Sequence, residues 1–366
     1  MSRPQVQLGD LGWDESWREA LLVAAGRASA GEPSAHEPGR VIRTDRGACS
    51  VATARGPVRA TVGGDVLEAA AGNPTLLPCT GDWCLVRHWA DGPVTVEAVA
   101  ERRTTVVRAS ARKSSHGQVL ATNADLVGLV VALHPEPNMI RLERLLSVAW
   151  QSGATPVVLL TKADLVSDGD QVADDVRDVA PGVEVRCVSA STLLGIGEIR
   201  ALLAPGRTIA LIGASGHGKS TLTNAVVGAD VLTTRPIRDD GRGRHTSVRR
   251  ELLLVPSGGA IVDTPGLRGV GLQYDDGALG AAFPEIDALT VHCRFRDCRH
   301  LDEPGCAVVD AVASGALAVR RWESWQTLQR ETARAQRRLD ARQRAEQTKK
   351  WRQRAQQRAY RRDGPR

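Results

Sequence analysis

Cysteine and long apolar runs are scarce in this sequence. Seven cysteines in 366 residues are too few for a secreted scaffold held together by disulfides. No uninterrupted apolar run approaches the roughly 18 residues that cross a bilayer, and the N-terminus lacks the basic-then-apolar pattern of a secretion signal. We therefore expect a cytoplasmic protein with no membrane contact, and its length allows two or three domains.

Positive charge is concentrated at the C-terminus. Residues 320–366 contain 16 Lys and Arg against 5 Asp and Glu, a local charge of +11 in a chain whose formal charge is +6. A basic segment of this kind favours binding to a phosphate backbone such as RNA. A solvated terminus that contacts nothing is the alternative that charge alone leaves open. We assign residues 320–366 to a basic helical tail.

A short helix and a linker open the chain. Trp17, Leu21 and Leu22 recur at helical spacing within residues 14–28, and a stretch rich in Gly and Pro then interrupts the pattern. We assign residues 1–38 to this helix and its linker.

Residues 39–112 predict a small β-barrel of the OB type. Short β-branched runs such as GRVIRTD, CSVATA and VTVEAVA alternate with Gly, Asp and Pro. Such barrels often bind single-stranded nucleic acid, but aromatic residues make up only 3% of the chain and Trp83 and Trp89 are the main candidates here to stack on bases. A packing module without a ligand is the alternative.

Strands alternate with helices over residues 113–272, which predicts a largely parallel, doubly wound α/β sheet. Ligands in such sheets bind beyond the carboxyl ends of the strands. Within this region, residues 213–220 (GASGHGKS) match the pattern G-x-x-x-x-G-K-[ST] directly after an apolar strand. Backbone N–H groups of such a loop hold phosphates, and its Lys reaches the outer ones. The predicted phosphate-binding residues are Gly213, Ser215, Gly216, Gly218, Lys219, Ser220 and Thr221.

Two further residues of this site follow a second strand. In GAIVDTPG, Asp263 is placed to complete the shell of a Mg²⁺ ion held by Ser220, and Gly266 can offer its N–H to the terminal phosphate. We expect His217, inside the loop, to be a solvated spacer.

The segment LLTKAD predicts recognition of guanine. Asp164 can accept hydrogen bonds from the ring N–H and the exocyclic amine of guanine, which adenine does not offer in this arrangement, and the Lys162 stem would lie across the base. Thr161 occupies a position where Asn is usual, so we expect a weaker link to the phosphate loop. Ser189 and Ala190, in VSAST, look like the second base-contacting turn.

These base-reading turns precede the phosphate loop in the chain, whereas in ordinary GTPases they follow it. Neighbouring parallel strands present their loops at the same sheet edge whatever their order in the sequence, and permutation of a chain with adjacent termini is tolerated. We therefore expect one intact, circularly permuted site.

A metal site is predicted after the nucleotide-binding region, within residues 273–319. Three thiols and an imidazole lie within fourteen residues, a set that suits tetrahedral zinc in a closed, structural site. Unrelated buried thiols beside a surface His are the alternative. Cys79 and Cys84 have no such companions and are expected to pack between strands. The predicted zinc ligands are Cys293, Cys298, His300 and Cys306.

Taken together, these motifs resemble the circularly permuted, RsgA-type (YjeQ-type) GTPases. The resemblance rests on LLTKAD ahead of GASGHGKSTLTN, on GRGRHTS at 241–247, on DTPG, on the Cys-Cys-His-Cys spacing and on the flanking barrel and tail. It implies an OB barrel, a permuted GTPase domain and a zinc-binding helical domain. It also implies docking on the small ribosomal subunit and its rRNA, with faster GTP hydrolysis there, and we expect a monomer.

The resemblance also bears on catalysis. Thr246 would be the switch residue that closes on Mg²⁺, with a plain polar loop residue as the alternative. Leu267 stands where many GTPases carry a water-orienting Gln, so intrinsic hydrolysis should be slow. His245 is one candidate for the missing group, and ordering by rRNA is the other. Lys219, Thr246 and His245 form the expected catalytic set. An RNA-binding scaffold with little turnover and an unrelated P-loop ATPase remain as alternatives.

Overall fold

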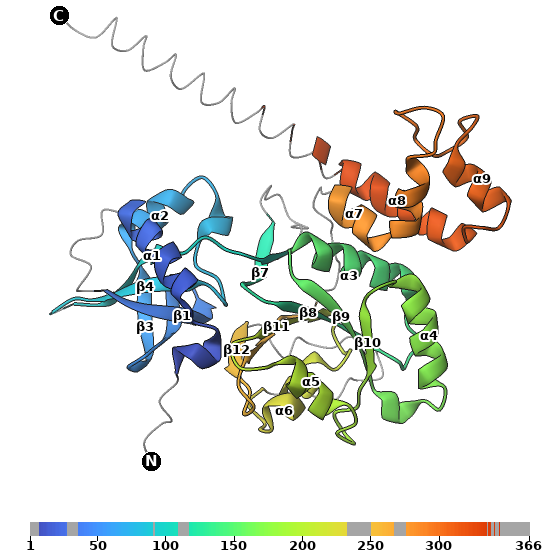
Figure 1. The fold of residues 1–366 in the computed structure, drawn as a ribbon. Coiled ribbons are helices and arrows are strands. Elements are labelled where there is room, and N and C mark those ends of the chain that lie inside the picture. Colours follow the sequence, from blue (N-terminus) through green and yellow to red (C-terminus); the bar gives the residue numbers. More distant parts are fainter. Residues whose placement is uncertain are drawn as a thin grey trace, which may run out of the picture.

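The computed structural model describes residues 7–27, 36–90, 92–108, 117–232, 250–266, 276–334, 336–337, 340 and 344. A barrel, a mixed sheet flanked by helices, and a helical C-terminal part follow one another along the chain (Figure 1). No helix in these ranges is long and apolar enough to cross a membrane.

The barrel has five strands and is closed. Its strands are β1 (His36–Asp45), β2 (Ala48–Thr53), β3 (Gly56–Val62), β4 (Trp83–His88) and β5 (Val94–Val99). They pair in the order β1-β2-β3-β5-β4, and a pairing of β4 with β1 closes the ring. The alternating apolar residues of the strands meet inside, with Val41, Val51, Cys84 and Val86 fully buried. The expected OB-like barrel is confirmed, and Cys84 is a packing residue within it.

Two short helices (η3, Pro74–Leu76, and α2, Gly64–Ala70) flank the barrel, and the N-terminal elements η1 (Leu8–Leu11) and α1 (Glu15–Arg27) pack against it. Trp17 and Leu21 face the core, as their spacing predicted, but Leu22 is exposed. Trp83 is 1% exposed because the rings of Trp13 and Trp17 pack on it at centroid distances of 5.1 and 6.0 Å. The expectation that Trp83 offers a stacking surface is therefore wrong, because its ring is part of the core.

The larger sheet contains β8 (Leu126–Ala132), β9 (Thr155–Thr161), β10 (Glu184–Cys187), β11 (Thr208–Gly213), β12 (Glu251–Leu254) and β13 (Ala260–Asp263). Their order is β10-β9-β8-β11-β13-β12, and all neighbours are parallel except the pair β12–β13. All residues of β8 and β11 are buried, as expected for strands covered on both faces. The predicted α/β sheet is confirmed.

The helices of this sheet are α3 (Met139–Gln151), α4 (Gly169–Val179), α5 (Ile196–Leu202) and α6 (Lys219–Val227). A separate two-stranded ribbon, β6 (Thr105–Arg108) with β7 (Gln118–Thr122), lies between the barrel and β8 in the chain.

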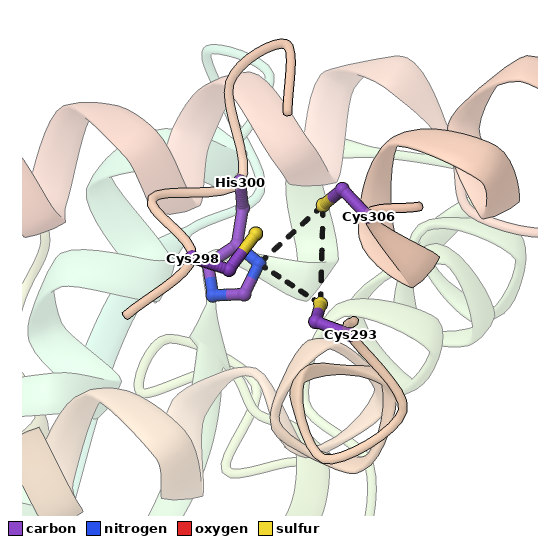
Figure 2. Close-up of side chains that lie close together, drawn as sticks. All are labelled: Cys293, Cys298, His300 and Cys306. Carbon is purple, nitrogen blue, oxygen red and sulfur yellow. Dashed lines mark hydrogen bonds between the residues drawn. The ribbon is translucent and has the colours of Figure 1, made fainter. Parts of the chain in front are cut away.

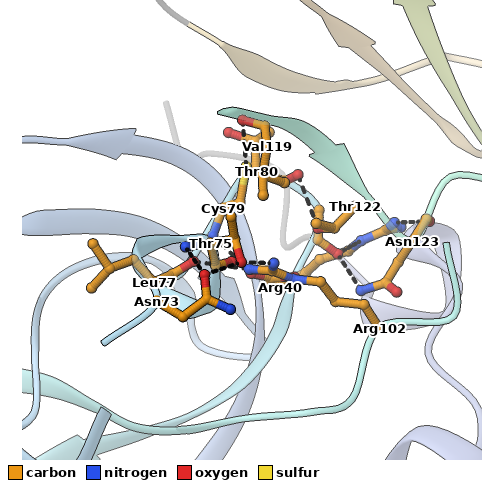
Figure 3. Close-up of polar contacts among 12 residues, drawn as sticks. Arg40, Asn73, Thr75, Leu77, Cys79, Thr80, Arg102, Val119, Thr122 and Asn123 are labelled. Carbon is orange, nitrogen blue, oxygen red and sulfur yellow. Dashed lines mark hydrogen bonds and ion pairs between the residues drawn. The ribbon is translucent and has the colours of Figure 1, made fainter. Parts of the chain in front are cut away.

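A buried arginine joins the barrel to the larger sheet. Arg40 on β1 is 2% exposed and donates to the Thr208 hydroxyl at 2.8 Å and to the Asn123 carbonyl at 2.8 Å. It also donates to the Gly81 carbonyl, which receives a second bond from the Asn123 amide. Arg40 and Asn123 are labelled in Figure 3. Burial lowers the pKa of Arg40 to about 10. On the same strand, Arg43 pairs with Glu251 of β12, so one sheet runs through both parts.

The C-terminal part contains α7 (Asp276–Ala282), α8 (Pro284–Thr290), α9 (Ala307–Ala313) and a helix over residues 319–334. Trp325 and Leu328 of that last helix are buried in the main core. The helix is fastened to α3 by Glu143, which is fully buried and accepts from Arg321 at 2.9 Å and from the Ser324 hydroxyl. The first fifteen or so residues of the predicted basic tail are thus packed helix.

Candidate nucleotide and metal sites

The G-x-x-x-x-G-K-S segment forms a turn between β11 and α6. Gly213 ends the strand with φ +158°, and an added Cβ there would lie 2.3 Å from the Val130 carbonyl oxygen. Only glycine fits this close approach. The turn delivers the chain to the N-terminus of α6, where unpaired backbone N–H groups favour an anion. This end of the sheet can therefore receive phosphate.

Lys219 starts α6 and points back over the turn. It is 5% exposed, and its Nζ donates to the carbonyls of Gly213 at 3.0 Å and Ala214 at 2.8 Å. Burial lowers the pKa of Lys219 to about 8, while the charge of Asp263 acts in the opposite direction. Asp263 offsets the charge of this buried ammonium group only in part, and a bound phosphate group would supply the remaining negative charge.

Asp263 lies at the end of β13, beside the start of α6. Its Oδ2 accepts from the Ser220 hydroxyl at 2.9 Å. Its Oδ1 is buried and has no hydrogen-bond partner among the described residues, and burial raises the pKa of this carboxyl. A carboxylate oxygen left without a donor beside a hydroxyl is a donor set that suits Mg²⁺.

Gly266 brings the third segment against the loop. A Cβ added to Gly266 would lie 2.8 Å from Cα of Ser215, so a side chain here would displace the phosphate loop. The Thr264 hydroxyl donates to the Leu211 carbonyl at 2.6 Å and fixes the chain between Asp263 and Gly266. The backbone of Gly266 is thereby held beside the predicted phosphate position.

The predicted base-reading turns lie at the same edge of the sheet. Asp164 follows β9 and accepts from the Ser189 hydroxyl at 2.6 Å and the Ser191 hydroxyl at 2.7 Å. These two donors lower the pKa of Asp164. The Lys162 Nζ donates to the His134 carbonyl at 3.0 Å, and Ala190 lies between the two serines. Ser191 was not among the predicted site residues. The only signal for it in the sequence is that it is a second serine, two residues after Ser189.

Thr161 connects the base-reading turn to the phosphate loop. Its hydroxyl donates to the His217 carbonyl at 2.7 Å, and the side chain is 5% exposed. Although Thr replaces the usual Asn, a direct hydrogen bond between the two loops is therefore present.

His217 is not the solvated spacer expected from the sequence. The Ala132 N–H donates to its Nδ1 at 3.3 Å, and the Val130 carbonyl lies at 3.3 Å from the same atom. Desolvation by burial lowers the pKa of His217 to about 4, so the ring is neutral at physiological pH. The imidazole packs the phosphate loop against β8 because a neutral ring can accept a backbone hydrogen bond.

The four predicted zinc ligands converge in the C-terminal part (Figure 2). Their ligand atoms all lie within 4.8 Å of one another. Cys293 Sγ is 3.4 Å from His300 Nδ1 and 3.9 Å from Cys306 Sγ. Ligands about 2.3 Å from a tetrahedral zinc ion are themselves about 3.8 Å apart, so the spacing of the group is close to that of a zinc site.

Neighbouring residues hold the zinc-binding loop in place. The His300 carbonyl accepts from Trp322 Nε1 at 3.3 Å, and the His300 ring meets the Trp325 ring edge to face at 5.5 Å. The Glu303 carboxylate accepts from the backbone N–H groups of Arg299 and Leu301, both at 2.9 Å. These bonds lower the pKa of Glu303 to about 2. The sequence had indicated the ligands but not these supporting groups.

Two predicted catalytic residues, His245 and Thr246, lie outside the described residues, as do Leu267 and most of the predicted tail. The phosphate loop, Asp263, Gly266 and both base-reading turns lie within the described ranges and at one sheet edge.

Comparison with known proteins identifies the family. The sequence model of the family described as RsgA GTPase matches residues 99–273. A Streptomyces coelicolor protein named small ribosomal subunit biogenesis GTPase RsgA is 45% identical over 351 residues, which cover 95% of this chain and 92% of that relative. The chain belongs to the RsgA GTPase family. An RsgA protein from Lactiplantibacillus plantarum is 40% identical over 311 residues, 85% of this chain and 87% of the relative.

Solved structures agree with this membership. YjeQ from Thermotoga maritima aligns with a TM-score of 0.60 at 25% identity, covering 81% of this chain and 99% of that one. YloQ, described as a circularly permuted GTPase, aligns with a TM-score of 0.55 at 23% identity, covering 81% and 95%. This RsgA-family chain is therefore a GTP-hydrolysing enzyme with a circularly permuted fold, and its family implies GTP and Mg²⁺ as ligands.

Proposed function

We propose that this RsgA-family chain binds the small ribosomal subunit and acts in its late maturation, hydrolysing GTP to GDP and phosphate. One observation carries the proposal: the chain aligns over 95% of its length with a relative named for small-subunit biogenesis. The intact convergence of its phosphate loop and base-reading turns supports it. We further propose that the protein is a cytoplasmic monomer whose turnover rises on the subunit and its rRNA.

The proposed division of labour follows the chain. In this proposal the barrel domain is residues 39–112, the permuted GTPase domain 113–272 and the zinc-binding domain 273–319, flanked by the N-terminal segment and the basic tail. The first barrel strand, β1, begins slightly earlier, at His36. The barrel and the tail are the proposed RNA contacts. The continuous sheet through β1 and β12 and the Glu143 contact on α3 support a concerted response of all three parts to nucleotide.

The residues of the loop have complementary proposed roles. The backbone from Gly213 to Thr221 would surround the phosphates, with Lys219 balancing their charge. Ser220 and Asp263 would hold Mg²⁺ together with Thr246, and the ion would neutralise charge that develops on the phosphate oxygens. Gly266 would contact the terminal phosphate through its N–H.

Base and metal recognition are assigned to separate side chains. Asp164 would accept the two guanine donors, the Lys162 stem would cover the base, and Ala190 would direct its N–H at the base oxygen. Cys293, Cys298, His300 and Cys306 would hold one structural zinc ion per chain.

Turnover with purified small subunits tests the proposed function. We expect GTP hydrolysis by the protein alone to be slow, and to rise at least about tenfold when small subunits are added, because the ribosome would supply the group that orders the switch. Large subunits are the control and should leave the rate unchanged. No stimulation by small subunits would instead favour an RNA-binding scaffold that holds GTP with little turnover.

The tail gives a second prediction. Residues 345–366 contain 8 Lys and Arg against 2 Asp and Glu. All described residues of the last helix, up to Arg344, precede them, so we expect their removal to leave the fold intact. We expect this truncation to weaken subunit binding at least about tenfold near 0.1 M salt, because contacts to phosphates are lost. Each lost contact should reduce the steepness of log affinity plotted against log salt concentration by about 0.7 to 0.9.

The measurement is subunit affinity over a range of salt concentrations. A full-length variant with the eight basic residues changed to Gln is the matched control and should behave like the truncation. Binding that keeps its strength and its salt dependence in both variants would show that the tail does not contact RNA.

A further inference from the structure

The carboxylate proposed to read guanine is held by two serine hydroxyls. Ser189 Oγ donates to Asp164 Oδ1 at 2.6 Å, and Ser191 Oγ donates to Asp164 Oδ2 at 2.7 Å. A serine hydroxyl has one proton, so both protons are committed to the carboxylate although the two hydroxyl oxygens lie 2.9 Å apart. Each carboxylate oxygen therefore accepts from one serine hydroxyl.

The two serines are fixed to different degrees. Ser189 is fully buried, and its hydroxyl oxygen accepts from the Thr192 N–H at 3.2 Å. Its backbone N–H donates to the Leu194 carbonyl at 3.0 Å, which closes the loop. Ser191 is exposed at the rim. Ser189 is therefore held by the fold, whereas the Ser191 hydroxyl contacts, among the described residues, only Asp164 and the Ser189 hydroxyl.

The position of the two turns is fixed by the backbone. The Ala163 N–H donates to the Val188 carbonyl at 3.2 Å, next to Asp164 and Ser189. The loop then folds back at Gly195, where an added Cβ would lie 2.8 Å from the Cys187 carbonyl oxygen. The serine hydroxyls are thus delivered to Asp164 by main-chain contacts that do not involve the carboxylate.

Asp164 itself is exposed, and the terminal torsion of a free aspartate is broad. Two donors, one on each oxygen, fix the plane of the carboxylate. Each oxygen can accept a second bond, so one site on each remains for the two donors of guanine. Inosine lacks the exocyclic amine and can use only one of these sites.

From this geometry we infer that Ser191 is a specificity-determining positioning residue, which orients the Asp164 carboxylate so that both of its oxygens meet guanine. Ser189 holds one carboxylate oxygen in place. Ser191 holds the other oxygen and so fixes the rotation of the carboxylate group. The inference rests on the guanine recognition proposed above and adds to it the residue that makes selection for the exocyclic amine stringent.

Binding of GDP and IDP to the full-length protein tests this inference. We expect Ser191→Ala to weaken GDP binding about fivefold to tenfold, as for loss of a hydrogen bond to a charged group at the surface. IDP affinity should change less than about twofold, because IDP engages only one oxygen. The ratio of GDP to IDP affinity should therefore fall by about threefold or more.

Two matched variants separate positioning from general disturbance. Ser191→Thr keeps the hydroxyl and should restore the ratio, and Thr192→Ala, which keeps the N–H used by Ser189, should leave both affinities unchanged. Equal loss of GDP and IDP affinity in Ser191→Ala, or no loss of either, would overturn the inference. If the unaltered protein shows no preference for GDP over ADP, the proposed guanine recognition itself fails, which is a separate result.

Discussion

Lys219→Met is expected to lower kcat/KM for GTP by about a hundredfold or more while making the nucleotide-free protein more stable. The loss of turnover follows because a charged group directed at the transferred phosphate contributes that much to phosphoryl transfer. The gain in stability follows because Lys219 is almost fully buried and burial lowers its pKa to about 8. Removing this charge should raise the free energy of unfolding by about 3 kcal/mol near pH 7.

The pH dependence of that gain has a defined sign. In the folded, nucleotide-free protein Lys219 binds its proton less tightly than in the unfolded chain, where its pKa is 10.5. The stability of the unaltered protein should therefore rise as the pH increases from about 8 to 10.5. The advantage of Lys219→Met should shrink over the same window, which denaturant unfolding at a series of pH values measures.

Nucleotide provides the control for this variant. With saturating GDP and Mg²⁺ only the unaltered protein should gain stability, because ligand binding to the native state adds to its free energy of unfolding. The order of stability should then reverse. A Lys219→Met protein whose kcat/KM for GTP is close to that of the unaltered protein, or that is less stable without nucleotide, would contradict the assignment of Lys219 as a buried charge kept for phosphate.

Cys306→Ser is expected to abolish zinc binding and to loosen the whole C-terminal part. Cys306 is 1% exposed and its Sγ lies 3.5 Å from His300 Nδ1 and 3.9 Å from Cys293 Sγ. Without the Cys306 thiolate, the predicted zinc site has three protein ligands instead of four. Because zinc binding by a small site is coupled to its folding, we expect a loss of at least about 3 kcal/mol of local stability.

Zinc content per chain and hydrogen exchange over residues 276–334 measure this effect. Cys187→Ser is the matched control, since Cys187 is a half-buried free cysteine outside the cluster, and it should keep about one zinc per chain. Retention of zinc by Cys306→Ser, or the absence of zinc from the unaltered protein, would contradict the assignment of the cluster as a structural zinc site.

Sequence motifs specified the chemistry of the candidate sites because each set of groups lies on a short stretch of chain. The loop over residues 213–220 carries its own glycines, lysine and serine, and the four zinc-ligand candidates fall within fourteen residues. Strand and helix alternation likewise predicted the α/β sheet, since the apolar runs of β8 and β11 are long enough to be buried on both faces. The OB-like barrel followed from the spacing of its strands and turns.

Contacts between distant segments could not be predicted in this way. Because Thr161 replaces the usual Asn, we expected a weaker link to the phosphate loop, yet its hydroxyl donates to the His217 carbonyl 56 positions away. His217 looked solvated, yet β8 provides a backbone N–H for its ring. Trp83 looked available for stacking, yet two tryptophans of the N-terminal segment cover it. In each case the contacting residue is distant in the sequence, so a short sequence pattern cannot predict the contact.

The sequence by itself therefore determined which groups are the candidates to bind phosphate, guanine and zinc, because residue type and short spacing decide what chemistry a segment offers. Only the tertiary structure decided which of these segments share a site. Parallel pairing of β8 with both β9 and β11 brings turns that are permuted in the chain to one sheet edge. Packing also decided that Ser191 meets Asp164 and that Glu143 meets Arg321, since both contacts depend on how separate elements are placed in space.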